Sequence, residues 1–165
     1  MYKILEKLDK KINFKTADAH CDIPCGIFDP INAQIAALTV VRMIDLMQTA
    51  FSSGGVNTID KVNEITRLVM VKEQHAERVK HEIRIIWGDA FKPQDLQKFP
   101  NVSTVVHEIM ALASTCKHKV DRQAGVNLVN KVNEFATIFY QMKNLQTVTA
   151  QAPYEPKLDI VYRKV

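Results

Sequence analysis

Four stretches of this sequence repeat apolar residues at alternating intervals of three and four, and this pattern limits the fold more than any other feature. The stretches run from Ile31 to Ile44, from Val62 to Ile86, from Val102 to Cys116 and from Ala124 to Met142. Apolar residues with this period share one face of an α-helix. The connections between the stretches are short, so neighbouring helices run antiparallel. The sequence predicts an all-α fold, an antiparallel up-and-down four-helix bundle over residues 30–145.

Local signals set the ends of these helices. Asp29 is the predicted N-cap of the first helix, with Pro30 at its first helical position. The second stripe is interrupted by Lys72 and stops near Trp87 and Gly88. Proline at both ends of residues 92–100 predicts a connecting segment there.

After residue 145 the chain changes character. Two prolines, Pro153 and Pro156, precede a stretch in which Leu158, Ile160 and Tyr162 alternate with polar or charged residues. Alternation of this kind is typical of extended backbone. We therefore expect residues 146–165 to form an extended C-terminal tail that covers a neighbouring surface.

Composition excludes several classes of protein. The 165 residues, 47% hydrophobic and 24% charged, suit one domain with one core. The net charge of +4 includes five lysines against three acidic residues within the first nineteen, so the balance gives no reason to expect nucleic-acid binding. No run of eighteen apolar residues indicates a membrane span, and the first nineteen residues lack the apolar core of a secretory signal. We expect a cytoplasmic protein.

Three potential metal ligands lie within six residues just before the first helix, namely His20, Cys21 and Cys25. The preceding Ala17-Asp18-Ala19 is a small-x-small pattern that a protease could cut, which would make His20 the N-terminus. The donors would then be an α-amine, an imidazole, two thiolates and a deprotonated backbone nitrogen. Square-planar sites of nitrogen and sulfur suit Ni(II) or Cu(II), whereas zinc usually takes side-chain ligands in a tetrahedral site. We call residues 20–30 the hook and residues 1–19 the leader.

The remaining cysteines and histidines have simpler interpretations. Cys21 and Cys25 could instead be a dithiol pair without metal. Cys116 lies on an apolar stripe and is expected to be a buried structural thiol. His81 and His107 are expected to be solvated or packed in the core, without a metal role.

The hook, from His20 to Pro30, resembles the metal hook of the nickel superoxide dismutase family, which reads His-Cys-x-x-Pro-Cys-Gly and continues to Asp-Pro. A second block, from Val71 to His81 and on through Trp87 to Pro93, is similar to that family's second helix and the turn after it. The resemblance covers most of residues 20–145.

This resemblance implies a superoxide dismutase that converts superoxide to dioxygen and hydrogen peroxide at one nickel ion per chain, cycling between +2 and +3. It implies His20, Cys21 and Cys25 as metal ligands, with Asp22 and Pro24 beside them, and a maturation protease that removes the leader. It also implies a homohexamer of four-helix bundles, with no nucleic-acid or membrane partner.

The sequence departs from the family pattern close to the hook. Phe28 and Ala90 stand where the family carries tyrosines, and Ala36 and His75 stand where it pairs a glutamate with an arginine that holds the axial histidine. His75 is a candidate for part of that support. Two alternatives therefore stay open: a non-enzymatic nickel or copper binding protein of the same fold, and a helical interaction module whose leader is never removed.

Overall fold

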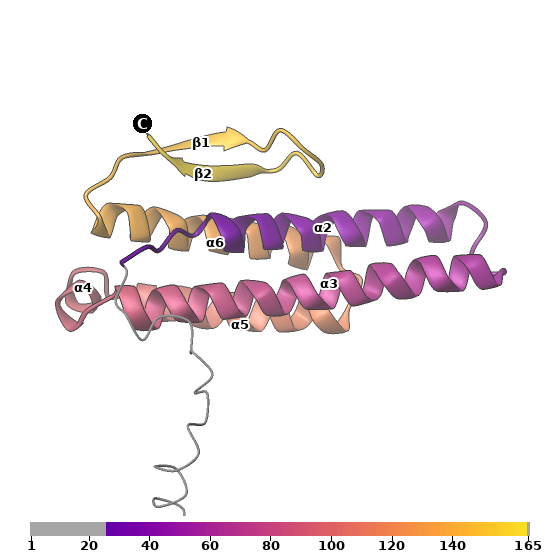
Figure 1. Cartoon of the computed structure of the whole chain (residues 1–165), viewed down its shortest axis with the longest axis horizontal. Coiled ribbons are helices and arrows are strands. Elements are labelled where there is room, and N and C mark those ends of the chain that lie inside the picture. Colours follow the sequence, from indigo (N-terminus) through magenta and orange to yellow (C-terminus); the bar gives the residue numbers. More distant parts are fainter. Residues whose placement is uncertain (1–25, 165) are drawn as a thin grey trace, which may run out of the picture.

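The computed structural model describes residues 26–164, and four long helices lie side by side in it (Figure 1). The leader and residues 20–25 of the hook lie outside the described residues. The long helices are α2 (Ile31–Ser52), α3 (Ile59–Ile85), α5 (Val102–His118) and α6 (Arg122–Met142). Between α3 and α5 lie a π-helical turn η1 (Ile86–Ala90) and a short helix α4 (Pro93–Lys98).

Each long helix packs against two others. The helix α2 contacts α3 and α6, and α5 contacts the same two helices from the opposite side. Their inward faces form one core, whose largest fully buried side chains include Leu38, Ile44, Ile83, Ile109 and Phe135. Within residues 26–164, α2 is the helix long and apolar enough to cross a bilayer. Its place in this core accounts for that composition. The mostly helical fold predicted from the four stripes is confirmed.

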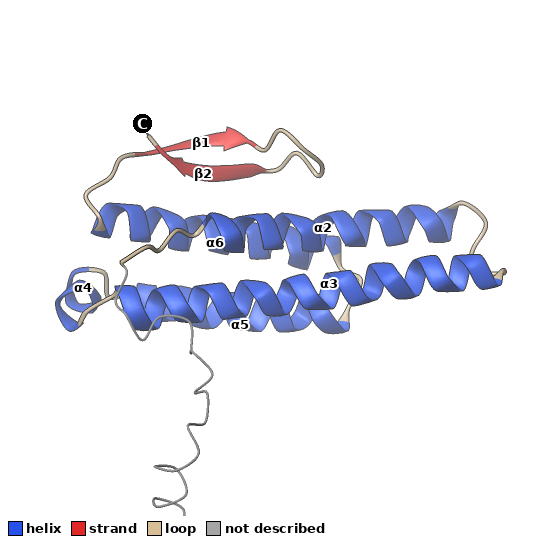
Figure 2. Cartoon of the chain, viewed as in Figure 1, coloured by secondary structure: helices blue, strands red, loops and turns tan. Residues whose placement is uncertain are grey.

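Two stripe residues lie at the surface, contrary to the prediction. Val62 is 46% exposed because α2 and α3 extend beyond the turn that joins α5 to α6 (Figure 2), so this part of α3 has fewer neighbours. Ile35 is 43% exposed and lies beside Tyr154 in a shallow surface groove. A stripe gives the direction of a side chain but not whether another element reaches it.

The helix ends differ in detail from the prediction. The first helix begins at Ile31, with Pro30 in the N-cap position. Asp29, the predicted N-cap, therefore lies one residue before the observed N-cap. Its carboxylate still accepts a hydrogen bond from the Ile31 amide, at 2.9 Å. The predicted connecting segment contains α4, whose start is held because Asp95 Oδ2 accepts from the Lys92 amide, at 2.9 Å.

Lys72, the residue that interrupts the second stripe, is buried for a structural reason. Its ammonium donates to the backbone carbonyls of Cys116 and of Lys117, the latter at 2.7 Å. Carbonyls of the last helical turn have no partner inside the helix, and a cation there also interacts favourably with the helix dipole. Lys72 therefore caps the C-terminal end of α5. Burial lowers its pKa from the ordinary lysine value.

The C-terminal tail is extended and forms an antiparallel hairpin of β1 (Thr147–Gln151) and β2 (Asp159–Arg163), drawn in red in Figure 2. This C-terminal hairpin packs on α6, and its Ile160 is fully buried. The all-α prediction therefore describes the bundle and misses the hairpin. The neighbouring surface that the tail covers belongs to its own bundle.

Candidate metal centre

The predicted metal ligands His20, Cys21 and Cys25, and their neighbours Asp22 and Pro24, lie outside the described residues. The structure describes the segment that joins them to the bundle, Gly26–Pro30, which we call the hook root. Gly26 has φ +68°, in the left-handed region that favours glycine. A glycine directly after Cys25 therefore suits the backbone conformation found here.

Apolar packing and hydrogen bonds attach the hook root to the bundle. Phe28 is half-buried and packs against the core, and Pro30 is buried. Asp29 Oδ1 accepts two hydrogen bonds, from the Ile31 amide at 2.9 Å and from the Tyr140 hydroxyl at 3.0 Å. The point at which the hook leaves the bundle is thus set by contacts from two helices, α2 and α6.

His75 has a partner within its own helix. Its Nδ1 lies 2.9 Å from the carbonyl oxygen of Val71, one turn earlier. A carbonyl can only accept, so Nδ1 carries the hydrogen and a neutral ring keeps its lone pair on Nε2. Ala36 is buried in α2 and offers no polar group. Within residues 26–164, no contact between His75 and Ala36 takes the place of the ion pair that a glutamate and an arginine could form.

Phe28 and Ala90 occupy the positions that lack a tyrosine, and neither side chain has a hydroxyl. Ala90 is buried and ends the turn η1. The next residue, Phe91, packs on Phe135 and Phe139 with ring centroids 5.9 and 6.4 Å apart. Phe28 and Ala90 both contribute apolar surface only.

Two further histidines and the third cysteine have the surroundings expected from the sequence. His81 and His107 are exposed. Cys116 is fully buried, and burial raises the pKa of its thiol to about 11, so it stays protonated at neutral pH. No cluster of three His, Cys, Asp or Glu side chains with metal-site geometry occurs in the part of the chain that the structure describes.

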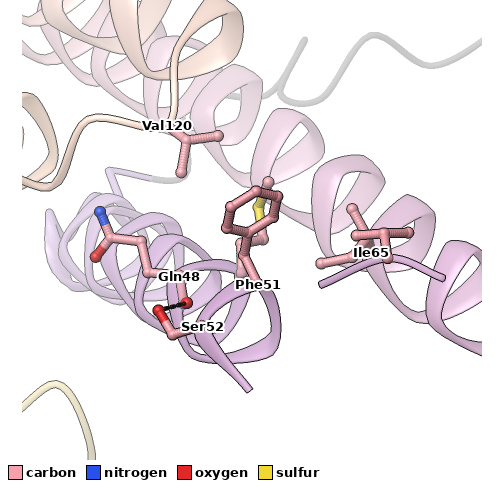
Figure 3. Close-up of a pocket in the computed structure, with 7 residues that line it drawn as sticks. Gln48, Phe51, Ser52, Ile65 and Val120 are labelled. Atoms are coloured by element: carbon pink, nitrogen blue, oxygen red, sulfur yellow. Dashed lines mark hydrogen bonds between the residues drawn. The ribbon is translucent and has the colours of Figure 1, made fainter. Parts of the chain in front are cut away.

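A separate apolar pocket of about 540 Å³ lies at the opposite end of α2 from the hook root. Figure 3 shows Phe51, Ile65 and Val120 around it, with Gln48 and Ser52 at one side, where the Ser52 hydroxyl donates to the Gln48 carbonyl at 2.9 Å. The helix separates this pocket from the hook root by about 30 Å, at 1.5 Å per residue. Its lining contains no ionisable side chain.

Two polar contacts near the start of α2 are not evident from the sequence. One is the bond from the Tyr140 hydroxyl to Asp29, for which the sequence signal is that a buried tyrosine usually has a partner for its hydroxyl. The other contact is a polar network between α2, α6 and the hairpin. The Gln34 amide nitrogen donates to Asn133 Oδ1 at 3.0 Å and to the Val161 carbonyl at 2.9 Å.

Comparison of the sequence with known proteins finds relatives over most of its length. A family model described as nickel-containing superoxide dismutase matches residues 15–143. Superoxide dismutase [Ni] from Streptomyces coelicolor is 32% identical over 128 residues, which are 78% of this chain and 91% of that protein. The protein of the same name from Streptomyces seoulensis is 31% identical over 125 residues, 76% of this chain and 88% of its own.

Solved structures agree with the sequence comparison. A crystal structure of nickel-containing superoxide dismutase, with nickel ligation corresponding to the oxidised state, superposes with a TM-score of 0.67 and 31% identity. The match covers 76% of this chain and 99% of that one. The family model ends before the C-terminal hairpin begins, so the hairpin is an addition to the part that is shared.

Proposed function

The chain belongs to the nickel-containing superoxide dismutase family, and from this premise we propose that it disproportionates superoxide at a nickel ion held by His20, Cys21 and Cys25. It is an oxidoreductase whose cofactor is nickel. The observation that carries the assignment of ligands is the run His-Cys-x-x-Pro-Cys-Gly at residues 20–26, inside the stretch that the family model matches.

The donor set of the hook suits nickel. Once His20 is the N-terminus, its amine, the thiolates of Cys21 and Cys25, and the deprotonated Cys21 backbone nitrogen would provide the four nitrogen and sulfur ligands that square-planar Ni(II) prefers. The His20 imidazole would be an additional nitrogen donor. Anionic thiolate and amide donors also stabilise a higher oxidation state. The attachment at Gly26–Pro30 supports this assignment, because a short hook needs a fixed origin to bring its donors together.

The reaction consumes two superoxide ions and two protons and yields one dioxygen and one hydrogen peroxide. A nickel ion held by His20, Cys21 and Cys25 would supply the redox chemistry for this reaction by cycling between +2 and +3. The protein must deliver two protons to the second ion. Phe28 and Ala90 carry no hydroxyl, so neither side chain can deliver these protons, and we propose water near the hook as their source.

The proposal includes maturation and assembly. Cleavage after Ala19 by a protease releases the amine of His20, and the mature chains act in the cytoplasm as a homohexamer. The small-x-small pattern at residues 17–19 supports the cleavage, and the family resemblance supports the hexamer.

Superoxide consumption by a chain that begins at His20 tests the proposal, measured after nickel loading and compared with the full chain under the same loading. We expect nickel bound at one ion per chain and activity only after trimming. Cys25→Ser should abolish nickel binding, whereas Cys116→Ser, a matched change to a thiol outside the hook, should preserve it. Nickel binding that survives Cys25→Ser would contradict the ligand assignment.

The absence of hydroxyls at Phe28 and Ala90 favours a second candidate, a nickel or copper binding protein of the same fold that does not turn over superoxide. Tight binding of nickel by the trimmed chain with no superoxide consumption would identify it. Restoring one phenol with Phe28→Tyr, at a half-buried position, would then be expected to raise the activity.

A further inference from the structure

The hook root meets the last turn of α6 at one end of the bundle. Figure 1 shows the start of α2 and the C-terminal end of α6 at the same end. There the Tyr140 hydroxyl donates to Asp29 Oδ1, at 3.0 Å, and the same oxygen accepts from the Ile31 amide. The two residues are 111 positions apart in the chain, so this bond joins the two ends of the bundle sequence.

The ring of Tyr140 is fixed before it reaches Asp29. Only 4% of the residue is exposed, and its ring packs edge-on against Phe139 with centroids 5.7 Å apart. Its carbonyl accepts from the Leu145 amide at 2.8 Å, while the Asn144 amide bonds to Gln141 and Asn144 has φ +57°. This is the Schellman arrangement that ends a helix. The hydroxyl is therefore presented from a rigid backbone and a packed ring.

The chemistry of the pair makes it a dependable contact. Burial, followed by the negative charge of Asp29, raises the pKa of the Tyr140 phenol far above its usual range, so the hydroxyl keeps its proton and always donates. A carboxylate acceptor makes this a charge-assisted bond, stronger than a bond between neutral groups.

We propose that Tyr140 is a positioning residue that sets the direction in which the hook leaves the bundle and thereby holds the metal ligands in place. The inference rests on the proposed function, because it takes Cys25 as a ligand. Three residues, 26–28, separate Asp29 from Cys25. A change at Asp29 is therefore transmitted over a short segment, and small errors in placement are costly at a reacting centre.

Tyr140→Phe tests the proposal because it removes the hydroxyl and leaves the ring. In the nickel-loaded chain that begins at His20, release of nickel to a chelator should be about tenfold faster, at the lower end of the effect of losing an orienting partner. Tyr162→Phe, the same change at a half-buried tyrosine of β2, is the matched control and should leave the release rate unchanged. Asp29→Ala removes the acceptor and should speed nickel release at least as much as Tyr140→Phe, and adding Tyr140→Phe to it should change little.

A second measurement separates positioning from general stability. In the metal-free full chain, amide exchange at Ile31, whose N–H donates to Asp29, should be faster in Tyr140→Phe than in the wild type. Ile44→Val, a core change about 20 Å along α2 at 1.5 Å per residue, lowers overall stability and should leave nickel release unchanged.

The outcomes are distinct for the two proposals. Unchanged exchange at Ile31 in Tyr140→Phe, or nickel release no faster than in Ile44→Val, overturns the role given to Tyr140. Failure of the wild-type chain beginning at His20 to bind nickel overturns the proposed function instead, and the exchange measurement still decides whether Tyr140 holds the hook root.

Discussion

Replacing Asn133 by alanine should loosen the C-terminal hairpin, because the Asn133 side chain, on α6, forms hydrogen bonds both to β2 of the hairpin and to Gln34 on α2. Asn133 Oδ1 accepts from the Gln34 amide nitrogen at 3.0 Å and from the Val161 amide at 3.2 Å. Asn133 Nδ2 donates to the Asp159 carbonyl at 2.8 Å. The backbone groups fix the direction of every bond, since a backbone N–H can only donate and a carbonyl can only accept.

The expected cost follows from these three bonds. A hydrogen bond inside a protein contributes about 1 kcal/mol net, and a buried donor left without a partner adds to the loss. Val161 and Gln34 are buried, whereas the bond to Asp159 is exposed and water can replace it. We therefore expect Asn133→Ala to lower the free energy of unfolding by about 2–3 kcal/mol, which corresponds to a fall in Tm of about 5–10 °C for a domain of this size.

Urea unfolding followed by circular dichroism measures this cost. Asn130→Ala, an exposed residue one turn earlier on the same helix, is the control and should change stability by less than about 0.5 kcal/mol. Proteolysis should cut the Asn133→Ala variant first within residues 146–164. Equal stability of the two variants, or a hairpin that resists proteolysis as well as in the wild type, would refute the reasoning.

Three further predictions concern the core. Cys116 should react with a thiol reagent only on unfolding; because its pKa is raised to about 11 from an unfolded value near 9, it stays protonated in the fold. Wild-type stability relative to Cys116→Ser should therefore fall as pH rises from 9 to 11, and a flat difference would contradict this. Lys72→Met should cost about 1–3 kcal/mol in urea unfolding, because it leaves end carbonyls of α5 without a donor, and a neutral effect would argue against the cap. Gly125→Ala should lower Tm although alanine favours helix, because the added Cβ would lie 3.0 Å from a side-chain carbon of Val41; a rise in Tm would show that the core can yield there.

Periodicity predicted the bundle well because burial on one face is what makes these helices stable. The stripe residues Leu38, Ile44, Ile83 and Ile109 are all buried as expected. The prediction for Val62 was wrong because neither α5 nor α6 reaches that part of α3, and a repeat in the sequence carries no information about the length of neighbouring elements.

Polar contacts between distant residues were beyond the reach of the sequence. The extended character of the tail could be predicted from alternation, but its docking depends on Gln34 and Asn133, which look like ordinary surface amides in the sequence. The interruption at Lys72 was visible, whereas its use as a cap for α5 depends on which helix lies opposite. Pairings of this kind are set by the fold and have no local signature.

The hook motif supports the proposed ligands, but the motif alone does not determine where they point. In this chain the direction is controlled at Asp29, where α2 begins, by Tyr140, where α6 ends. Gln34 lies about one turn after Asp29 along α2, and Asn133 lies two turns before Tyr140 in α6. Together they hold the same two helices to the hairpin. The hairpin lies outside the matched family region, so this chain adds its own support to the pair of helices that carries the hook. Loss of the hairpin contact should therefore weaken nickel retention less than loss of the Tyr140 hydroxyl, because the hairpin acts on the helices and Tyr140 acts on the hook root itself.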